Sequence, residues 1–380
     1  MRILFLDQSG KLGGAELCLA DIAQRFRQTS LVGVFTEGTF PDYLRQLNIP
    51  VEILSDQALR VQKASGLWAG LRSLNRLLPL IAKVTQLSQN YDLIYANTQK
   101  ALVVGAIASF LSRRPLIYHL HDIVSPDHFS ATNRRIIVAL ANRAALIIAN
   151  SQASRDAFIA AGGRADTVHV VYNGFRAQPY QVSVENRTSI HKSLNLQEKF
   201  IVGHFSRLAP WKGQHVLIQA LAHCPENIIV LLVGEALFGE NDYVAYLHQL
   251  INELNLKHRV HFLGFRSDVP NLMHACDLVA HTSIAPEPFG RVIVEAMLCS
   301  RPIIASAAGG AIELVDHGQT GWLFPPGDAI KLADIIRDCQ TNEARRLTLA
   351  THAQITAQSR FNLDNTNQDI AQLLAKVSRY

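Results

Sequence analysis

At 380 residues, the chain is longer than one ordinary hydrophobic core requires, so we expect two domains. Hydrophobic residues make up 48% and charged residues 18% of the sequence, which excludes an intrinsically disordered chain. The net charge of +5 is uneven, since residues 1–180 contain 19 Lys and Arg against 12 Asp and Glu. With no basic stripe interleaved with aromatic residues, this excess favours anionic lipid or an anionic acceptor over nucleic acid.

Short apolar runs alternate with helical patterns along the whole chain, which is typical of a parallel α/β sheet. The expected strands of the first half are 3–6, 31–35, 51–54, 93–95, 116–119, 146–149 and 168–171. Those of the second half are 201–205, 228–233, 260–263, 278–280, 303–305 and 322–324. The polar stretch 175–199 has weak periodicity and is interpreted as an interdomain linker.

A glycine-rich turn, SGKLGGAE at residues 9–16, follows the first expected strand and precedes an amphipathic helix. It has neither the GxGxxG spacing of a dinucleotide site nor the GK[ST] of a P-loop, which argues against both nucleotide-binding classes. A helix-capping turn is the structural interpretation of this segment.

A long helical pattern covers residues 66–89, with apolar positions such as Trp68 and Leu71 and basic ones such as Arg72 and Arg76. The preferred interpretation is the core face of a helix in a Rossmann-like domain. Docking on a membrane surface is the alternative.

Two histidines alternate in the segment YHLHD, at positions 119 and 121, directly after the fifth expected strand. His119 is interpreted as strand interior. An HxH pair can bind zinc, but the spacing suggests no third ligand, so no metal site is predicted.

The second half opens with FSRLAPWKG, which places Arg207 and Lys212 in a loop at the carboxyl end of a strand. Two cations in such a loop can neutralise a leaving diphosphate without a metal ion. A pair of unrelated surface cations is the alternative.

The segment EPFGRVIVEAM carries Glu287 and Glu295 on either side of a helix start near Gly290. The free N–H groups and the positive dipole end of a helix N-terminus suit an anion such as a diphosphate. Two carboxylates beside such a diphosphate-binding site suit a sugar nucleotide, whose sugar and ribose are both rich in hydroxyl donors. An ordinary capped helix with Glu295 on its solvated face is the alternative.

The whole stretch from Glu287 to Asp328 resembles the family-4 retaining glycosyltransferases of the GT-B fold. It contains EPFG, a second glutamate eight positions after the first, a GGxxE segment at 309–313 and the run GxxGxLxxPxD at 318–328. The loop at 206–213 resembles the family's GRLxxxKG, and residues 13–16 resemble its GGAE turn. Ser206 and Ser300 stand where the family usually has glycine.

The resemblance implies an α/β GT-B fold with two Rossmann-like domains facing across a cleft. We expect an acceptor-side domain at 1–180, with a C-terminal helix at 362–378 packing back on it, and a nucleotide-sugar domain at 195–360. The implied activity is the metal-independent, retaining transfer of a hexose from a nucleoside-diphosphate sugar to a glycan, lipid-linked or small-molecule hydroxyl, as in polysaccharide biosynthesis. No cofactor is implied.

The resemblance also assigns roles to particular residues. Arg207, Lys212 and the helix start at Gly290 would hold the diphosphate, Glu295 the ribose, and Glu287 the donor sugar. His121 would also reach the sugar, and the nucleobase would stack near 264–266. The full set implied for donor binding or catalysis is Gly13, Gly14, His121, Asn173, Arg207, Lys212, Phe265, Arg266, Glu287, Phe289, Gly290, Arg291, Val292 and Glu295.

The sequence leaves several alternatives open. The nucleotide of the donor is UDP, GDP or ADP. The alternative function is that of a catalytically inactive partner subunit that binds sugar nucleotide. Five scattered cysteines without metal-ligand spacing, and no apolar leader, predict a cytoplasmic protein. Peripheral contact with the inner face of the membrane through the basic half stays open.

Overall fold

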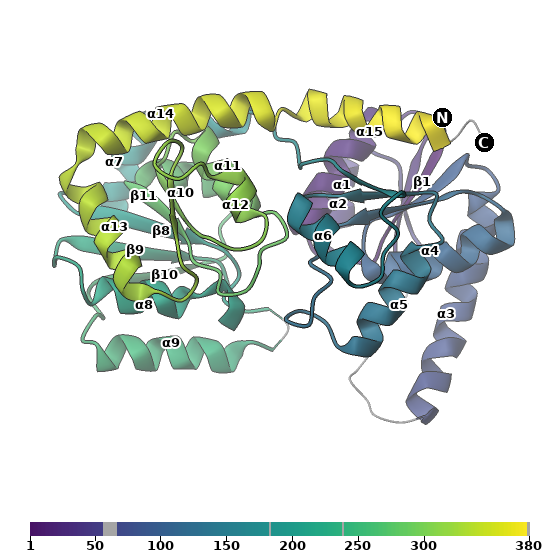
Figure 1. Cartoon of the computed structure of the whole chain (residues 1–380), viewed down its shortest axis with the longest axis horizontal. Helices are drawn as coiled ribbons and strands as arrows, with labels where there is room; N and C mark the ends of the chain where they lie inside the picture. The colour runs from purple at the N-terminus through teal and green to yellow at the C-terminus, as the bar shows by residue number, and fades with distance from the viewer. Residues whose placement is uncertain (56–66, 182–183, 238, 378–380) are drawn as a thin grey trace. The chain divides into compact units, whose positions relative to one another are not determined.

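The computed structural model describes residues 1–55, 67–181, 184–237 and 239–377. The chain forms two compact units, one made of Met1–Gly174 with the C-terminal segment from Leu363, the other of Phe175–Asn362. Each unit is a parallel sheet with helices on both faces (Figure 1). The expected α/β class with two Rossmann-like domains is therefore confirmed, and each expected strand is present to within one residue at either end.

The first unit contains a seven-stranded sheet in the order β3-β2-β1-β4-β5-β6-β7, all parallel. Its strands are β1 (Ile3–Asp7), β2 (Leu31–Val34), β3 (Val51–Ile53), β4 (Leu93–Ala96), β5 (Leu116–Leu120), β6 (Leu146–Ala149) and β7 (Val168–Val170). Its helices are α1 (Gly14–Arg25), α2 (Thr39–Gln46), α3 (Leu67–Ser88), α4 (Gln99–Ser112), α5 (Ala131–Ala141), α6 (Gln152–Ala160) and α15 (Leu363–Val377).

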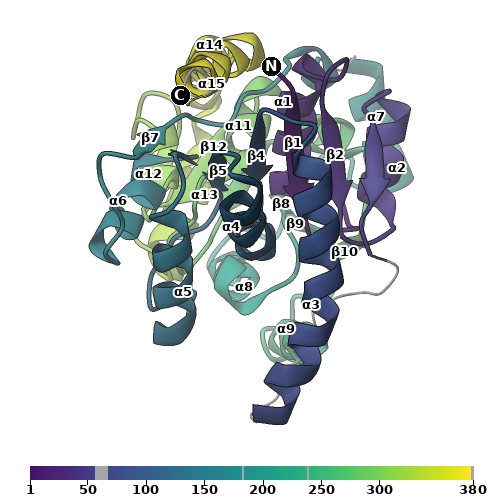
Figure 2. The same ribbon diagram turned by 90° about the vertical axis from the view of Figure 1, so that its right-hand side faces the viewer.

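Two apolar layers cover this sheet, because its central strands β1, β4 and β5 are buried along their whole length and are mostly apolar. One layer packs α1, α2 and α15 on the sheet, with Ile370 and Leu374 of α15 fully within it. The other layer packs α3 to α6. Helices α3 and α4 lie side by side (Figure 2).

Helix α3 matches the long helical pattern expected at 66–89. Leu80, Ile81 and Val84 belong to the apolar core, which supports the interpretation as a core-facing helix for this part. Gly66 and the side chains of residues 67–76, including Trp68 and Arg72, lie outside what the structure describes. None of the described helices is long and apolar enough to cross a bilayer.

The second unit contains a six-stranded parallel sheet in the order β10-β9-β8-β11-β12-β13. Its strands are β8 (Phe200–Phe205), β9 (Ile228–Val233), β10 (Val260–Gly264), β11 (Leu278–His281), β12 (Ile303–Ser306) and β13 (Trp322–Phe324). Its helical segments are η1 (Gln178–Tyr180), α7 (Val184–Ser193), η2 (Pro210–Lys212), α8 (Gln214–Leu221), α9 (Asn241–Glu253), α10 (Val269–Ala275), α11 (Arg291–Leu298), α12 (Ala311–Leu314), α13 (Ala329–Thr341) and α14 (Glu343–Arg360).

The interpretation of 175–199 as a linker is wrong, because this stretch belongs to the second unit and contains α7. Arg187 forms an ion pair with Asp277 at 2.7 Å, and a ring nitrogen of His191 lies 2.7 Å from the carbonyl oxygen of Ala275. These polar contacts attach α7 to the end of α10 and to the residues that follow it. A surface helix attached in this way has weak apolar periodicity, which is why its pattern resembled that of a linker. The second unit begins at Phe175 rather than at 195.

Candidate active site

Each sheet has a position where the strand order reverses, and in parallel sheets the loops at the carboxyl ends of these strands bind ligands. In the second unit this position lies between β8 and β11, which are neighbours in the sheet. The loop after β8 carries Arg207 and Lys212, and the loop after β11 carries Glu287. The topology therefore brings these predicted cations and the first predicted carboxylate to one edge of the sheet.

The carboxylate of Glu287 is buried in a cluster of donors. Its Oε2 accepts from Lys212 Nζ at 2.7 Å and from Ser283 Oγ at 3.0 Å, and it lies 3.3 Å from His281 Nε2. Because a carboxylate only accepts, a hydrogen bond between His281 and Glu287 places a proton on His281 Nε2, which also lies 3.2 Å from Ser283 Oγ. Burial acts to raise the pKa of Glu287, but the Lys212 ammonium and the bond from His281 outweigh it and keep the pKa well below its usual range. Glu287 is therefore an anion fixed in one orientation.

The loop that carries Lys212 is attached to the end of β11 by tight backbone contacts. Gly213 has φ +70, and a Cβ there would lie 2.0 Å from the carbonyl oxygen of Thr282, so this position requires glycine. Thr282 Oγ1 donates to the carbonyls of Lys212 and Gly213, and Ile284 N donates to the carbonyl of Trp211. The Trp211 ring lies 4.1 Å from Lys212 Nζ. These contacts position the ammonium before any ligand binds.

Gly309 and Gly310, the two glycines of the GGxxE segment, lie against the backbone of Glu287. Gly310 N donates to the Glu287 carbonyl at 2.7 Å, and Glu287 and Gly309 form an isolated parallel bridge. A Cβ on Gly309 would lie 2.3 Å from the Glu287 carbonyl oxygen, and one on Gly310 would lie 2.6 Å from that of Pro288. The two glycines therefore hold the loop that ends in Glu287.

The helix start predicted near Gly290 is present, since Gly290 is the left-handed N-cap (φ +95) of α11. Phe289 points into the interior, where its ring packs near Phe175 and Phe361, so only its backbone remains for a ligand. Arg291 lies over the Phe175 ring and pairs with Glu295 at 3.4 Å, one turn along the helix. Val292 is half-buried in the first turn.

The other predicted donor-binding residues of this unit lie in loops at the same edge of the sheet. Arg207 is 31% exposed, near Glu240 at 3.9 Å and the Trp211 ring. Phe265 follows β10 and is 71% exposed, which is unusual for a phenylalanine. Arg266 beside it forms a two-point ion pair with Asp268 at 2.7 and 2.8 Å.

In the first unit, three neighbouring strands end in a chain of polar contacts that reaches His121. Asp7 at the end of β1 accepts from Asn97 Nδ2 at 2.7 Å, and Asn97 follows β4. Because that amide nitrogen also donates to the Ala15 carbonyl, Asn97 Oδ1 is the acceptor for His121 Nε2 at 2.8 Å. A neutral His121 therefore carries its lone pair on Nδ1. Burial and the nearby Glu16 raise the pKa of Asp7 to about 7.

The predicted glycine turn of the first unit leads into α1, whose N-cap is Gly13 and whose first residue is Gly14. A Cβ on Gly13 would lie 2.7 Å from Glu16 Oε2. Burial raises the pKa of that glutamate. Asn173, a predicted contact to the donor, is buried and accepts from Cys18 Sγ at 3.3 Å, so its side chain serves the interior of this unit.

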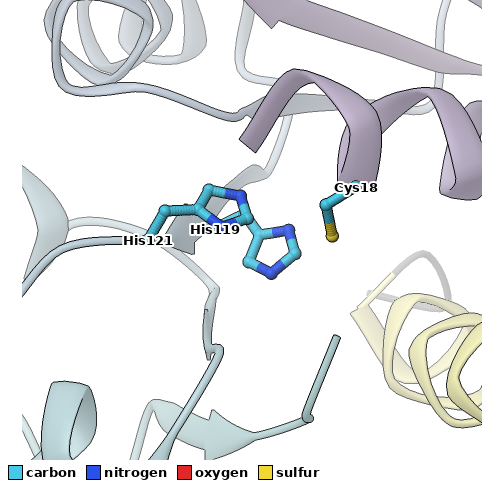
Figure 3. A group of neighbouring side chains, drawn as sticks. All are labelled: Cys18, His119 and His121. Atoms are coloured by element: carbon cyan, nitrogen blue, oxygen red, sulfur yellow. The ribbon is translucent and has the colours of Figure 1, made fainter. Parts of the chain in front are cut away.

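The spacing suggested no third ligand for the HxH pair, but the fold supplies one. Cys18 on α1 and one ring nitrogen from each of His119 and His121 lie within 4.8 Å of one another (Figure 3). The two imidazole centres are 3.9 Å apart, with 36° between the ring planes. Cys18 is 101 positions before His119 in the sequence, so no short motif could reveal it.

Sequence reasoning missed Asp7, Asn97, His281 and Ser283. Each lies at or just after the carboxyl end of a buried strand, and a polar residue at that position of a parallel strand was the signal that could have found it.

Comparisons with known proteins identify the family and the fold. Residues 186–356 match the family model described as glycosyl transferases group 1, and residues 12–178 match the model described as glycosyltransferase family 4. The crystal structure of Anabaena HepE in complex with UDP-glucose is similar, with 57% sequence identity over 99% of this chain and 100% of that chain, and a TM-score of 0.93. HepE also has a crystal structure in complex with UDP and glucose.

More distant relatives match over shorter regions. An uncharacterized glycosyltransferase of Methanocaldococcus jannaschii is 27% identical over 249 residues, or 62% of this chain. Spore coat protein SA of Bacillus subtilis is 30% identical over 220 residues, or 54% of this chain. These matches span 63% and 58% of the two relatives' own lengths.

Proposed function

The chain belongs to the family-4 glycosyltransferases of the GT-B fold, and on that premise we propose that it transfers glucose from UDP-glucose to a hydroxyl acceptor with retention of configuration. UDP-glucose is the proposed donor because HepE, 57% identical, was crystallised with it. Hydroxyls of a glycan, a lipid-linked saccharide or a small molecule form the acceptor class.

The contact between Lys212 and Glu287 is the observation that carries the proposal. An ammonium has three N–H donors, and one of them holds the carboxylate, so the others can meet the diphosphate. Among described residues, the side-chain donors to Glu287 go to Oε2, which directs Oε1 to the hydroxyls of the donor sugar. Glu295 on α11 then serves the ribose, and Phe265 stacks on the base.

Charge stabilisation by the protein's own cations is the proposed chemistry. As the bond between sugar C1 and the diphosphate oxygen breaks, Arg207, Lys212 and the amides that start α11 stabilise the charge on UDP. The acceptor oxygen attacks C1 from the same face, and a leaving phosphate oxygen takes its proton. His121 contacts the donor sugar in this proposal, and neither metal nor cofactor is required.

The test is release of UDP when the protein is mixed with UDP-glucose and saccharide acceptors, with product configuration read by NMR. GDP-mannose, ADP-glucose and UDP-galactose are the comparison donors. A preferred donor at 100 times its Kd should stabilise the protein by about 2.7 kcal/mol in thermal unfolding. Binding of UDP-glucose without turnover on any acceptor would instead support the inactive partner subunit.

Peripheral membrane contact is a separate part of the proposal and rests on the end of α4. A cavity of about 980 Å³ there is lined by apolar Phe110 and Leu111 and by basic Arg113, Arg114 and Lys376, among others. Phe110 is 76% exposed and Leu111 57%, which suits an anionic lipid surface. Sedimentation with phosphatidylglycerol vesicles, but not with phosphatidylcholine vesicles, is expected. Phe110→Ser should weaken that binding.

A further inference from the structure

We propose that Cys18, His119 and His121 form a binding site for a late first-row divalent metal ion such as Zn²⁺. One thiol and two imidazoles are ligands that this class of metal prefers, whereas Mg²⁺ and Ca²⁺ prefer oxygen. The three ligand atoms already lie within 4.8 Å of one another. Tetrahedral coordination at about 2.0–2.3 Å places ligand atoms about 3.3–3.8 Å apart, so closure requires movements of only about 1 Å.

A buried polar atom gives independent support for a ligand at this place. The His119 side chain is only 1% exposed, and its Nε2 has no hydrogen-bond partner in the part of the chain that the structure describes. Its Nδ1 lies 2.7 Å from the hydroxyl of Tyr95. A buried ring nitrogen without a partner is costly in a folded protein, and ligand binding is one way to compensate it.

The surroundings already orient two of the ligands, as outer groups do in metal sites. The Tyr95 hydroxyl holds the His119 ring through Nδ1, and Asn97, itself fixed by Asp7, holds His121 through Nε2. Cys18 comes from α1, and the two histidines come from the end of β5, as Figure 3 shows. On binding, the Cys18 thiol loses its proton to solvent and the thiolate coordinates the metal.

The consequence for activity rests on the proposed function. His121 is assigned to the donor sugar. A metal ion bound to its ring would make it unavailable to the sugar and would add positive charge beside the sugar. Zn²⁺ should therefore inhibit glucosyl transfer reversibly, and a chelator should restore it. The transfer reaction itself uses no metal in this account, so the two proposals are compatible.

The test is titration of the chelator-treated full chain with Co²⁺, whose bond to a thiolate produces a charge-transfer absorption band. One equivalent should bind, Zn²⁺ should displace it, and Mg²⁺ should not. Cys18→Ser should abolish the band and weaken Co²⁺ binding at least 10-fold, whereas Cys224→Ser should bind as the wild type does. Cys224 is the matched control because it is a buried cysteine whose sulfur contacts backbone carbonyls.

Wild-type affinity in Cys18→Ser, or absence of the band in the wild type, would overturn the site. If Cys18→Ser fails to fold, His121→Asn provides the same binding test on a half-exposed side chain. Activity is measured separately as UDP release, where Zn²⁺ should inhibit the wild type and spare Cys18→Ser. Binding of Co²⁺ without inhibition would keep the metal site and refute the role given to His121.

Discussion

Replacing Lys212 with methionine should destabilise the protein strongly, because it leaves the Glu287 carboxylate buried without its cation. The two side chains are only 15% and 11% exposed and lie 2.7 Å apart. Breaking one partner of a buried ion pair costs about 3–5 kcal/mol, whereas an exposed pair contributes about 0–1 kcal/mol. Lys83→Met is the matched control, since Lys83 pairs with Glu52 at 2.9 Å with both side chains more than one third exposed.

The assay is urea unfolding of single and double variants. Adding Glu287→Gln to Lys212→Met should recover much of the lost free energy, because no lone charge then stays buried. The pH dependence has a defined sign. In the wild type the pKa of Glu287 is depressed, so its contribution is complete above about pH 4.5 and constant from pH 5 to 8.

In Lys212→Met, burial is expected to dominate and raise the pKa of Glu287, so this variant should gain stability as the pH falls from 8 to 5. The stability gap to the wild type should therefore be smaller at pH 5. Strict additivity of the two substitutions, or a gap that is independent of pH, would refute the description of Glu287 as an anion held by Lys212.

Three further predictions follow from the same site. Arg207→Ala should lower kcat about 10²-fold or more at saturating donor, and near-normal turnover in the folded variant would remove Arg207 from charge stabilisation. Calorimetry should show that Glu295→Gln binds UDP more weakly, whereas Glu287→Gln binds UDP almost as the wild type does but loses turnover. Equal losses of UDP affinity would reject the assignment of Glu295 to the ribose and of Glu287 to the sugar. Activity should survive EDTA, and loss restored only by Mg²⁺ or Mn²⁺ would contradict the metal-independent mechanism. 

The alternation of apolar runs and helical patterns was enough to predict both sheets, because buried parallel strands are short and apolar on both faces. Motif spacing likewise predicted that Glu287 lies in a loop directly before a helix that starts near Gly290, and the structure confirms this. The spacing of residues within a motif cannot predict contacts between segments that are distant in the sequence. Lys212 and Glu287 received separate roles from their motifs, yet their side chains form one ion pair.

The same limit explains why the third possible metal ligand, Cys18, was missed. Helix α1 and the end of β5 are far apart in the sequence and come together only in the folded sheet. The periodicity of the sequence therefore does not reveal that Cys18 lies near the two histidines. The error at 175–199 has a different cause. Helix α7 is held by Arg187 and His191 through polar contacts, and these leave no apolar stripe for a pattern to detect.

The return of α15 to the first unit has a consequence for the order in which the chain folds during synthesis. Domains usually fold in the order in which they leave the ribosome. Here Ile370 and Leu374 complete the core of the unit that begins at Met1, and Asn367 donates to the Asp21 carbonyl of α1. The second unit is continuous in sequence and can fold first, while the nascent first unit still lacks the part of this apolar layer that α15 contributes. A ribosome that stalls near residue 362 would therefore release a chain whose later half is finished and whose earlier half is exposed to chaperones and proteases.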